Sequence, residues 1–351
     1  DDGERRLHVG GYGQIRYPLN AADAGPDQDG FESGFQVERV RLVLSGRLRD
    51  GTSFLLLPFT GRNGTLSILD AWVRQRITDE WSVTAGQFKL PFWREWLVSE
   101  RFIQPVERST LAIDFASIYA QGVKASYASG PWSFEAAYSD GLRSLNSPYA
   151  GAADGTDTES QQGALTVRTE YLAFGTKADF TDLTSFANTE PGLLLGIAGH
   201  WQGETESFFG IEINSLVQGT VDASYEAEGW NAFAAAVARH IEFPGGEGEE
   251  TDIGLLAQAG VFVTDDVELV GRYTALIPDP DVSADNTFHE LLAGANYYIA
   301  GHALKLTGDV QYFFDDPSDT SVVGFGPNPG TGLLASDGGQ IAVRLQLQFI
   351  F

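Results

Sequence analysis

The chain has 351 residues, of which 43% are hydrophobic and 12% aromatic, and it contains neither Cys nor Met. Its 48 acidic and 22 basic residues give a formal net charge of -26, which argues against a nucleic-acid-binding protein because such proteins need a basic surface. Without Cys this chain has no disulfide framework, Cys-ligated zinc site or catalytic thiol, and no stretch reaches the roughly 18 consecutive apolar residues of a membrane helix.

Apolar and polar residues alternate along many short segments. Within residues 37–49, Val40, Leu42 and Leu44 fall on one face, and the arginines fall on the other. The same period of two recurs in residues 302–314 and is kept to the last residue in 341–351. A strand sorts side chains in this way, whereas a helix does not.

The alternation predicts sixteen strands along the chain. In order, they lie near residues 7–17, 34–49, 52–60, 65–78, 81–90, 118–129, 131–140, 162–172, 191–202, 215–226, 229–242, 252–263, 266–276, 287–299, 302–314 and 338–351. We find no linker or change of pattern between them, so we expect one domain that spans residues 1–351.

The connections between these strands alternate between short and long. Tight turns fall at residues 50–51, 78–80, 129–131, 227–229, 264–265 and 300–301, and long polar loops at 18–33, 91–117, 141–161, 203–214, 243–251, 277–286 and 315–337. The short connection at 61–64 and the long one at 173–190 break the rule, and the topology of 173–190 stays open. The pattern is typical of an all-β, antiparallel outer-membrane barrel, with short turns and both termini on the periplasmic side. A soluble all-β binding protein is a more distant alternative.

The basic residues are concentrated early in the chain, where 14 of the 22 lie at or before Arg108. Alternation predicts that Arg49 and six other arginines of the early strands point into the lumen. Closure of the barrel places Arg344, on the last strand, beside them. This predicted basic wall consists of Arg16, Arg39, Arg41, Arg47, Arg74, Arg76 and Arg344. Such a wall needs a water-filled lumen and would favour permeating anions. The alternative is a solvated strand face whose arginines have no special role.

The segment 91–117 is too apolar for an exposed loop and too mixed for a spanning strand. We expect this third loop to fold into the lumen and narrow it, because sixteen strands otherwise leave a wide aqueous channel. Its predicted constriction residues are Lys89, Arg94, Glu95, Glu100, Arg101, Glu107 and Arg108. If the glutamates face the basic wall, they create a transverse field across the constriction. The alternatives are a loop that caps the outside or one that packs at a subunit interface.

Catalytic and metal-binding patterns are sparse. The acidic groups Asp23/Asp27/Asp29, Glu247/Glu249/Glu250/Asp252 and Asp315/Asp316/Asp319 match no Ca²⁺-loop pattern and are better explained as a hydrophilic rim, although divalent cation binding there stays open. The five histidines show no metal-ligand spacing, and no GxSxG motif occurs. We therefore expect no enzyme activity, no metal site and no cofactor.

An ordered set of short motifs resembles the O/P-type porins, the family named for phosphate-selective outer-membrane porins. The matching stretches are Gly10-Gly11-Tyr12-Gly13-Gln14, Glu38-Arg39-Val40-Arg41-Leu42 with Gly46, Gly86-Gln87-Phe88-Lys89-Leu90-Pro91-Phe92 with Glu95 and Ser99, Glu107-Arg108, Gln121-Gly122-Val123, Gly271-Arg272-Tyr273, Gly294-Ala295-Asn296-Tyr297-Tyr298 and Arg344-Leu345-Gln346-Leu347-Gln348-Phe349. The resemblance implies a trimeric barrel of sixteen strands with a constricting third loop, a lumen-facing pair at Arg39 and Arg41, and Lys89 where that loop begins.

The expected function is passive diffusion of small polar solutes or inorganic ions through a homotrimeric channel in the bacterial outer membrane, surrounded by its lipids. We do not carry phosphate specificity over, because the chain has only four lysines and its predicted external loops are strongly acidic. The alternative function is a plugged barrel that anchors the envelope or presents its loops to a partner.

Overall fold

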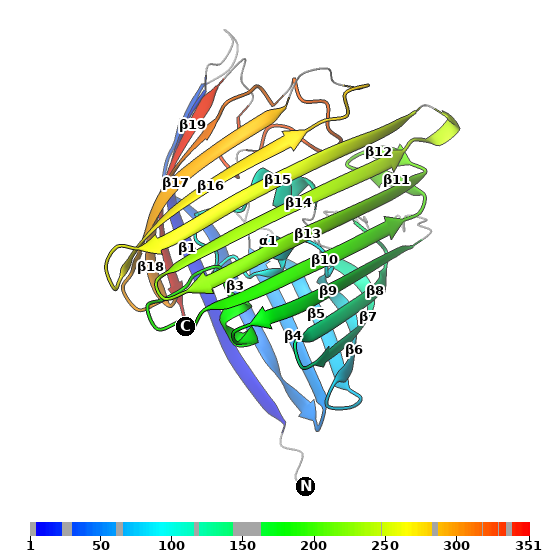
Figure 1. Ribbon diagram of the computed structural model, residues 1–351, viewed down its shortest axis with the longest axis vertical. Helices are drawn as coiled ribbons and strands as arrows, with labels where there is room; N and C mark the ends of the chain where they lie inside the picture. The colour runs from blue at the N-terminus through cyan, green and yellow to red at the C-terminus, as the bar shows by residue number, and fades with distance from the viewer. Residues whose placement is uncertain are drawn as a thin grey trace.

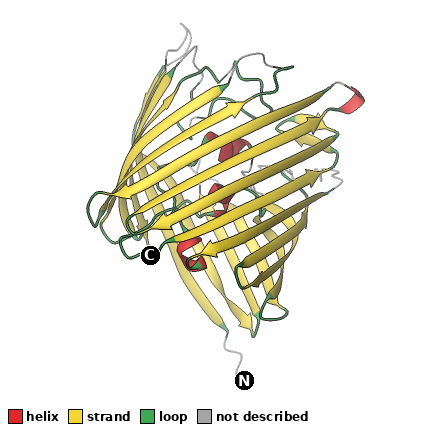
Figure 2. Cartoon of the chain, viewed as in Figure 1, coloured by secondary structure: helices red, strands yellow, loops and turns green. Residues whose placement is uncertain are grey.

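The computed structural model describes residues 5–22, 30–60, 66–115, 119–142, 163–246, 248–282, 287–317, 319–328, 330–334 and 339–351. The predicted acidic group Asp23/Asp27/Asp29, residue Glu247 and the connection 61–64 lie outside these ranges. The described ranges form a β-barrel with short helices inside it and at its ends (Figures 1 and 2).

Sixteen long strands make the barrel wall in the described residues. They are β1 (Arg6–Ala22), β3 (Gln36–Arg49), β4 (Thr52–Thr60), β5 (Leu66–Arg76), β6 (Trp81–Lys89), β7 (Tyr119–Ser129), β8 (Trp132–Ser139), β9 (Ala164–Phe174), β10 (Gly192–Gln202), β13 (Ser215–Ala227), β14 (Trp230–Glu242), β15 (Glu249–Phe262), β16 (Val267–Ile277), β17 (Phe288–Tyr298), β18 (Leu304–Phe313) and β19 (Gln340–Ile350). Three short strands lie in the connections: β2 (Phe31–Ser33), β11 (Thr205–Phe208) and β12 (Ile211–Ile213).

Each long strand pairs antiparallel with its neighbours, and the last strand closes the barrel on the first. Tyr12 of β1 lies opposite Ile350 of β19 on one side, and Arg41 of β3 on the other. Among the described strands, closure leaves no unpaired edge in the wall. The predicted all-β barrel of sixteen antiparallel strands is therefore confirmed.

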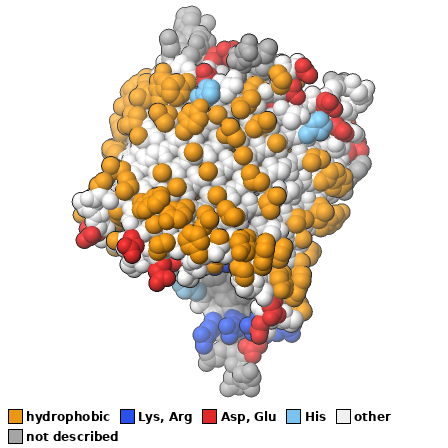
Figure 3. Space-filling model, in the orientation of Figure 1, with side chains coloured by type: hydrophobic (Ala, Val, Ile, Leu, Met, Phe, Trp, Pro, Cys, Tyr) orange, Lys and Arg blue, Asp and Glu red, His pale blue; other side chains and the backbone are white. Residues whose placement is uncertain are grey.

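The side chains alternate between the two faces of the wall, as the sequence predicts. In β15, Ile253 and Leu255 are exposed outward, while Asp252 and Leu256 are buried inside the barrel. Outward apolar side chains cover the surface in Figure 3, where they gather in two bands near the ends of the strands. No helix in the described part of the chain combines the length and the hydropathy of a membrane-crossing helix.

The two ends of the barrel differ in their connections. At one end the strands are joined by tight turns that use left-handed glycines, such as Gly51 (φ 71°) between β3 and β4 and Gly229 (φ 77°) between β13 and β14. A side chain at these φ values is strained, so glycine is the favoured residue. Strand β1 begins and β19 ends at this same end of the barrel (Figure 1).

Four short helices lie in those parts of the connections that the structure describes. Helices α1 (Arg94–Leu97) and α2 (Thr110–Asp114) belong to the connection between β6 and β7, η1 (Lys177–Thr181) follows β9, and η2 (Pro244–Gly246) follows β14. In Figure 2, helices are visible inside the barrel behind the front strands. The buried apolar residues of the connection between β6 and β7 join inward-facing side chains of the wall in one cluster.

Candidate functional site

The connection between β6 and β7, residues 90–115, contacts inward-facing side chains of strands around the barrel. The Val106 amide donates to Asp309 Oδ2 of β18 at 2.9 Å, and the Phe92 carbonyl accepts from Arg168 of β9 at 2.9 Å. Gln218 of β13 donates to the Phe115 carbonyl at 3.1 Å. These contacts reach three separate parts of the wall, so the segment lies across the interior of the barrel. We call residues 90–115 the lumen segment.

Apolar packing and a local cap explain why the lumen segment folds inward. Trp93, Leu111 and Phe115 are fully buried and share a cluster with Val237 and Leu256 of the wall. The Ser109 hydroxyl accepts from the Ala112 amide at 3.2 Å and so caps α2. Burying these large side chains stabilises the folded segment by roughly 1.5–3 kcal/mol each.

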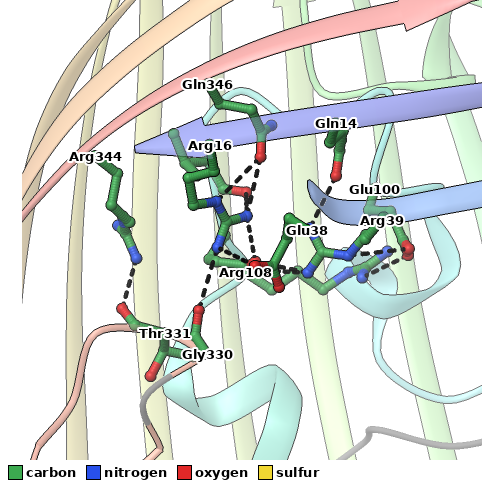
Figure 4. A network of polar contacts seen from close by, with 12 residues as sticks. Gln14, Arg16, Glu38, Arg39, Glu100, Arg108, Gly330, Thr331, Arg344 and Gln346 are labelled. Atoms are coloured by element: carbon green, nitrogen blue, oxygen red, sulfur yellow. Dashed lines mark hydrogen bonds and ion pairs between the residues drawn. The ribbon is translucent and has the colours of Figure 1, made fainter. Parts of the chain in front are cut away.

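The predicted arginines Arg16, Arg39 and Arg41 contact glutamates of the lumen segment directly (Figure 4). Glu107 accepts from Arg16 at 2.5 Å and from Arg39 at 2.6 Å. Glu100 pairs with Arg41, with Arg108 at 3.2 Å and with Arg39 at 3.5 Å. These arginines therefore hold the lumen segment against β1 and β3. The sequence instead suggests that the glutamates face the basic wall across an open gap.

The environment of the two glutamates keeps both of them charged. Burial alone raises the pKa of Glu100, but the guanidinium groups of Arg41, Arg108 and Arg39 outweigh it and hold that pKa well below its usual range. Burial acts in the same direction on Glu107, and Arg39 and Arg16 reverse it, so its pKa also lies below the usual range. The contact is thus a set of charge-assisted hydrogen bonds.

A cavity of about 300 Å³ lies beside this ion-pair cluster. Its lining includes three arginines and three glutamates together with apolar and loop residues: Glu38, Arg39, Arg41, Trp96, Glu100, Glu107, Arg108, Ile113, Asn328, Gly330 and Thr331. The formal charges of its ionic groups cancel. We call this space the throat cavity.

The predicted residues Arg47, Arg74 and Arg76 lie away from the throat, toward the end with the tight turns. They line a larger cavity of about 640 Å³, which we call the vestibule, together with Lys177. Arg74 donates to the Thr84 hydroxyl at 3.1 Å, and its guanidinium lies 4.9 Å from the centre of the Trp72 ring. Within the described ranges, no carboxylate lies within 4.0 Å of its guanidinium nitrogens, although four acids line other parts of the vestibule.

The last predicted basic residue, Arg344, is buried in the wall. It donates to Asp309 Oδ1 at 2.7 Å and to the Thr331 carbonyl at 2.6 Å, and the neighbouring Gly330 carbonyl accepts from Arg16 at 3.3 Å (Figure 4). Part of the connection between β18 and β19 thus reaches down to the throat cavity.

The other predicted constriction residues bind the lumen segment to its surroundings. Arg94 donates to Ser224 at 2.8 Å, and Glu95 accepts from the Ser109 amide at 2.8 Å and from Arg272 at 3.3 Å. Lys89 of β6 donates to the Trp96 carbonyl at 2.6 Å, and the Arg101 guanidinium lies 5.6 Å from the centre of the Tyr12 ring of β1. Of the seven predicted residues, Glu100, Glu107 and Arg108 line the throat cavity.

The connection between β9 and β10 is a part of the interior that the sequence leaves open. The Leu183 amide donates to the Phe102 carbonyl at 3.3 Å, and the Phe180 carbonyl accepts from Arg94 at 2.6 Å, so this connection packs against the lumen segment. Its Ser185 and Phe186 bond to the β13–β14 turn. The apolar residues Phe180, Leu183 and Phe186 in this long connection are the signal that could have indicated the packing.

The strands from β13 to β19 face the lumen segment with paired, buried polar groups. Arg272 bonds to Glu95 and to the Glu107 carbonyl, while Arg239 bonds to Asp252 at 3.1 Å. We call this half of the interior the filled side. We call the other half of the interior, where residues of β3 to β9 line the vestibule, the vestibule side. Within the described residues, no group of three or more potential metal ligands occurs.

The chain matches the family described as "Phosphate-selective porin O and P" over residues 9–232. The chain belongs to this family. No curated protein matches the porin. Its family and its closed barrel are those of a channel in the bacterial outer membrane rather than those of an enzyme.

Solved structures share the fold of this porin at low sequence identity. OmpT of Vibrio cholerae has a TM-score of 0.65 at 11% identity, covering 100% of this chain and 99% of that one. An anion-selective porin from Comamonas acidovorans has a TM-score of 0.66 at 14% identity, covering 99% and 100%. The channel DcaP of Acinetobacter baumannii has a TM-score of 0.61 at 12% identity, covering 99% of each chain. At this level of identity, the likeness shows the fold alone.

Proposed function

We propose that this porin is a passive diffusion channel for small hydrophilic solutes that prefers anions, and that the vestibule side sets the preference. The observation that carries the proposal is the guanidinium of Arg74, which lines the vestibule with Arg47 and Arg76 and has only a neutral hydroxyl as its hydrogen-bond partner in the described ranges. A fixed positive charge in a water path raises the local concentration of anions.

The throat contributes less to this preference than the sequence suggests. Arg16, Arg39 and Arg41 contact Glu107 and Glu100, so much of their charge is compensated within the protein. The chain as a whole is acidic, and predicted external loops carry many of the acids, which repel anions at low ionic strength but are screened at high ionic strength. The preference should therefore be modest and should be clearest in concentrated salt.

The proposal includes an assembly and an orientation. One of the similar solved structures, OmpT of Vibrio cholerae, is described in a trimer form, which supports a homotrimer. The end with the tight turns, where β1 begins and β19 ends, would face the periplasm, because short turns face that side in barrels of this kind.

The test is the reversal potential across a planar bilayer with a tenfold KCl gradient. We expect a chloride preference in the wild-type porin, and Arg74→Gln should reduce the anion-to-cation permeability ratio by about twofold. The control is Val73→Ala, the neighbouring residue whose side chain is exposed on the outer surface. A folded barrel without stepwise conductance would contradict the channel. A cation preference that Arg74→Gln leaves unchanged would contradict the role of the vestibule.

A further inference from the structure

The inward face of β4 and β5 carries large apolar side chains between the throat cavity and the vestibule. Leu55, Leu57 and Phe59 alternate along β4, and Trp72 lies opposite Leu55 on β5. Arg41 lies opposite Phe59 on β3, and its guanidinium stacks over that ring, which places this face inside the barrel. We call Leu55, Leu57, Phe59 and Trp72 the apolar strip.

The strip connects the two cavities in space. At its outer end, Phe59 contacts Arg41, which lines the throat cavity. At its inner end, Ser53 and Arg74 are the next residues on the same face after Leu55 and Trp72, and both line the vestibule. The six steps along β3 from Arg41 to Arg47 span about 20 Å at the usual strand rise of roughly 3.3 Å per residue.

The strip is an exception to the chemistry expected of this surface, because the interior of a water-filled barrel is polar. On the filled side, the inward apolar residues Phe233 and Leu256 are covered by the lumen segment and are almost fully buried. All four side chains of the strip are only half-buried, although Leu57 and Phe59 also touch the apolar cluster of the lumen segment.

Cations lie over aromatic rings throughout this part of the wall. The Arg41 guanidinium is 4.8 Å from the centre of the Phe59 ring, and the Arg74 guanidinium is 4.9 Å from that of Trp72. On the neighbouring strands, Lys124 Nζ lies 5.4 Å from the Phe88 ring. The Arg41–Phe59 and Arg74–Trp72 pairs, one at each end of the strip, place a half-buried ring beside a guanidinium. The Phe88 ring, in contrast, is buried, and Lys124 is paired with Glu135 at 2.8 Å.

We propose that the preferred solutes are organic monoanions with an apolar body, such as an arylalkanoate carboxylate. This inference rests on the proposed channel function and names its substrate class. The carboxylate is attracted by Arg74 and Arg47 in the vestibule, while the apolar body moves along the strip. A small inorganic anion uses the same charges and gains nothing from the strip.

The test compares two carboxylates of equal charge as blockers of the chloride current through single channels in planar bilayers. The probes are 3-phenylpropionate and propionate, added to 1 M KCl. We expect 3-phenylpropionate to block with an apparent affinity about tenfold higher than propionate, because a phenyl ring adds apolar area that the strip covers.

Two substitutions locate the effect in the strip. Trp72→Ala and, separately, Leu55→Ser should each lower the affinity for 3-phenylpropionate about threefold to tenfold, with the affinity for propionate changed by less than about twofold. Trp72→Phe should retain most of the preference, which separates loss of the ring from a fault in folding. Val73→Ala on the outer surface is the matched control.

The outcomes distinguish this inference from the channel proposal. Equal block by the two carboxylates, or an aromatic preference that survives both Trp72→Ala and Leu55→Ser, would overturn the inference while leaving the channel intact. A folded wild-type barrel with no conductance would overturn both. Retention of the preference in Trp72→Phe together with its loss in Trp72→Ala supports the strip.

Discussion

The filled side and the vestibule side use the same residue type, arginine, in opposite ways. Arg272 on the filled side is fully buried, bonds to Glu95 and the Glu107 carbonyl, and lies 3.7 Å from Glu290. Arg74 on the vestibule side bonds to a hydroxyl and stacks on Trp72. A buried guanidinium must be paired because desolvation is costly, whereas one that borders water can keep its charge available. The difference teaches that inward orientation alone does not make an arginine part of the permeation path.

The largest contrast is expected in stability. Arg272→Ala leaves Glu95 and Glu290 buried without this partner, so it should lower the free energy of unfolding by about 3–5 kcal/mol. Arg74→Ala should cost less than about 1 kcal/mol, because it breaks no ion pair within the described ranges. The measurement is urea-dependent unfolding in lipid vesicles, followed by tryptophan fluorescence. An equal loss of unfolding free energy in the two variants would contradict the distinction between the filled side and the vestibule side.

The next effect concerns the balance of charge in the throat. Glu107→Gln removes the carboxylate shared by Arg16 and Arg39 and leaves the throat cluster with one more positive than negative charge, so the anion-to-cation permeability ratio should rise about twofold to threefold. Reversal potentials in a KCl gradient measure the ratio. Glu228→Gln, in the exposed β13–β14 turn, is the control and should change nothing. An unchanged permeability ratio in Glu107→Gln would show that the charge of this cluster does not affect the permeating ions.

The response to pH tests the same cluster without a substitution. In the folded porin, the pKa values of Glu100 and Glu107 lie below the usual range. Their ion pairs therefore stabilise the fold at any pH above the ordinary carboxyl pKa. This stabilisation is lost only as the pH falls through the lower pKa values of the folded state. In 1 M KCl, which screens the acidic loops, the permeability ratio should change by less than about 1.3-fold between pH 7 and pH 4.5. A rise in anion preference with a midpoint near pH 4.5 contradicts the pairing.

The smallest effect is expected from Arg76, at the rim of the vestibule. This side chain is 62% exposed and its nearest carboxylate oxygen, on Asp79, is 3.8 Å away, so solvent screens much of its charge. Arg76→Gln should change the permeability ratio by less than about 1.3-fold in the same measurement. A change as large as that in Arg74→Gln would extend the selective region to the rim.

Much of the wall could be predicted because strand alternation is a local property. The segment predicted at 52–60 is β4 with the same bounds, whereas β1 extends to Ala22, beyond its predicted end at residue 17. The first strand is longer because its outer half pairs with β19 and with β2, and such pairing depends on residues far away in the sequence. Local patterns could not supply that information.

The sequence by itself determined the barrel and the unusual composition of the third loop, since each follows from period-two alternation or local composition. The tertiary structure alone decided which arginines are neutralised. Arg39 and Arg74 both point inward, but only Arg39 meets Glu107, because the lumen segment crosses the interior at that height. The packing of Leu183 and Phe180 against the lumen segment was likewise decided by contacts between residues far apart in the chain, which no local pattern encodes.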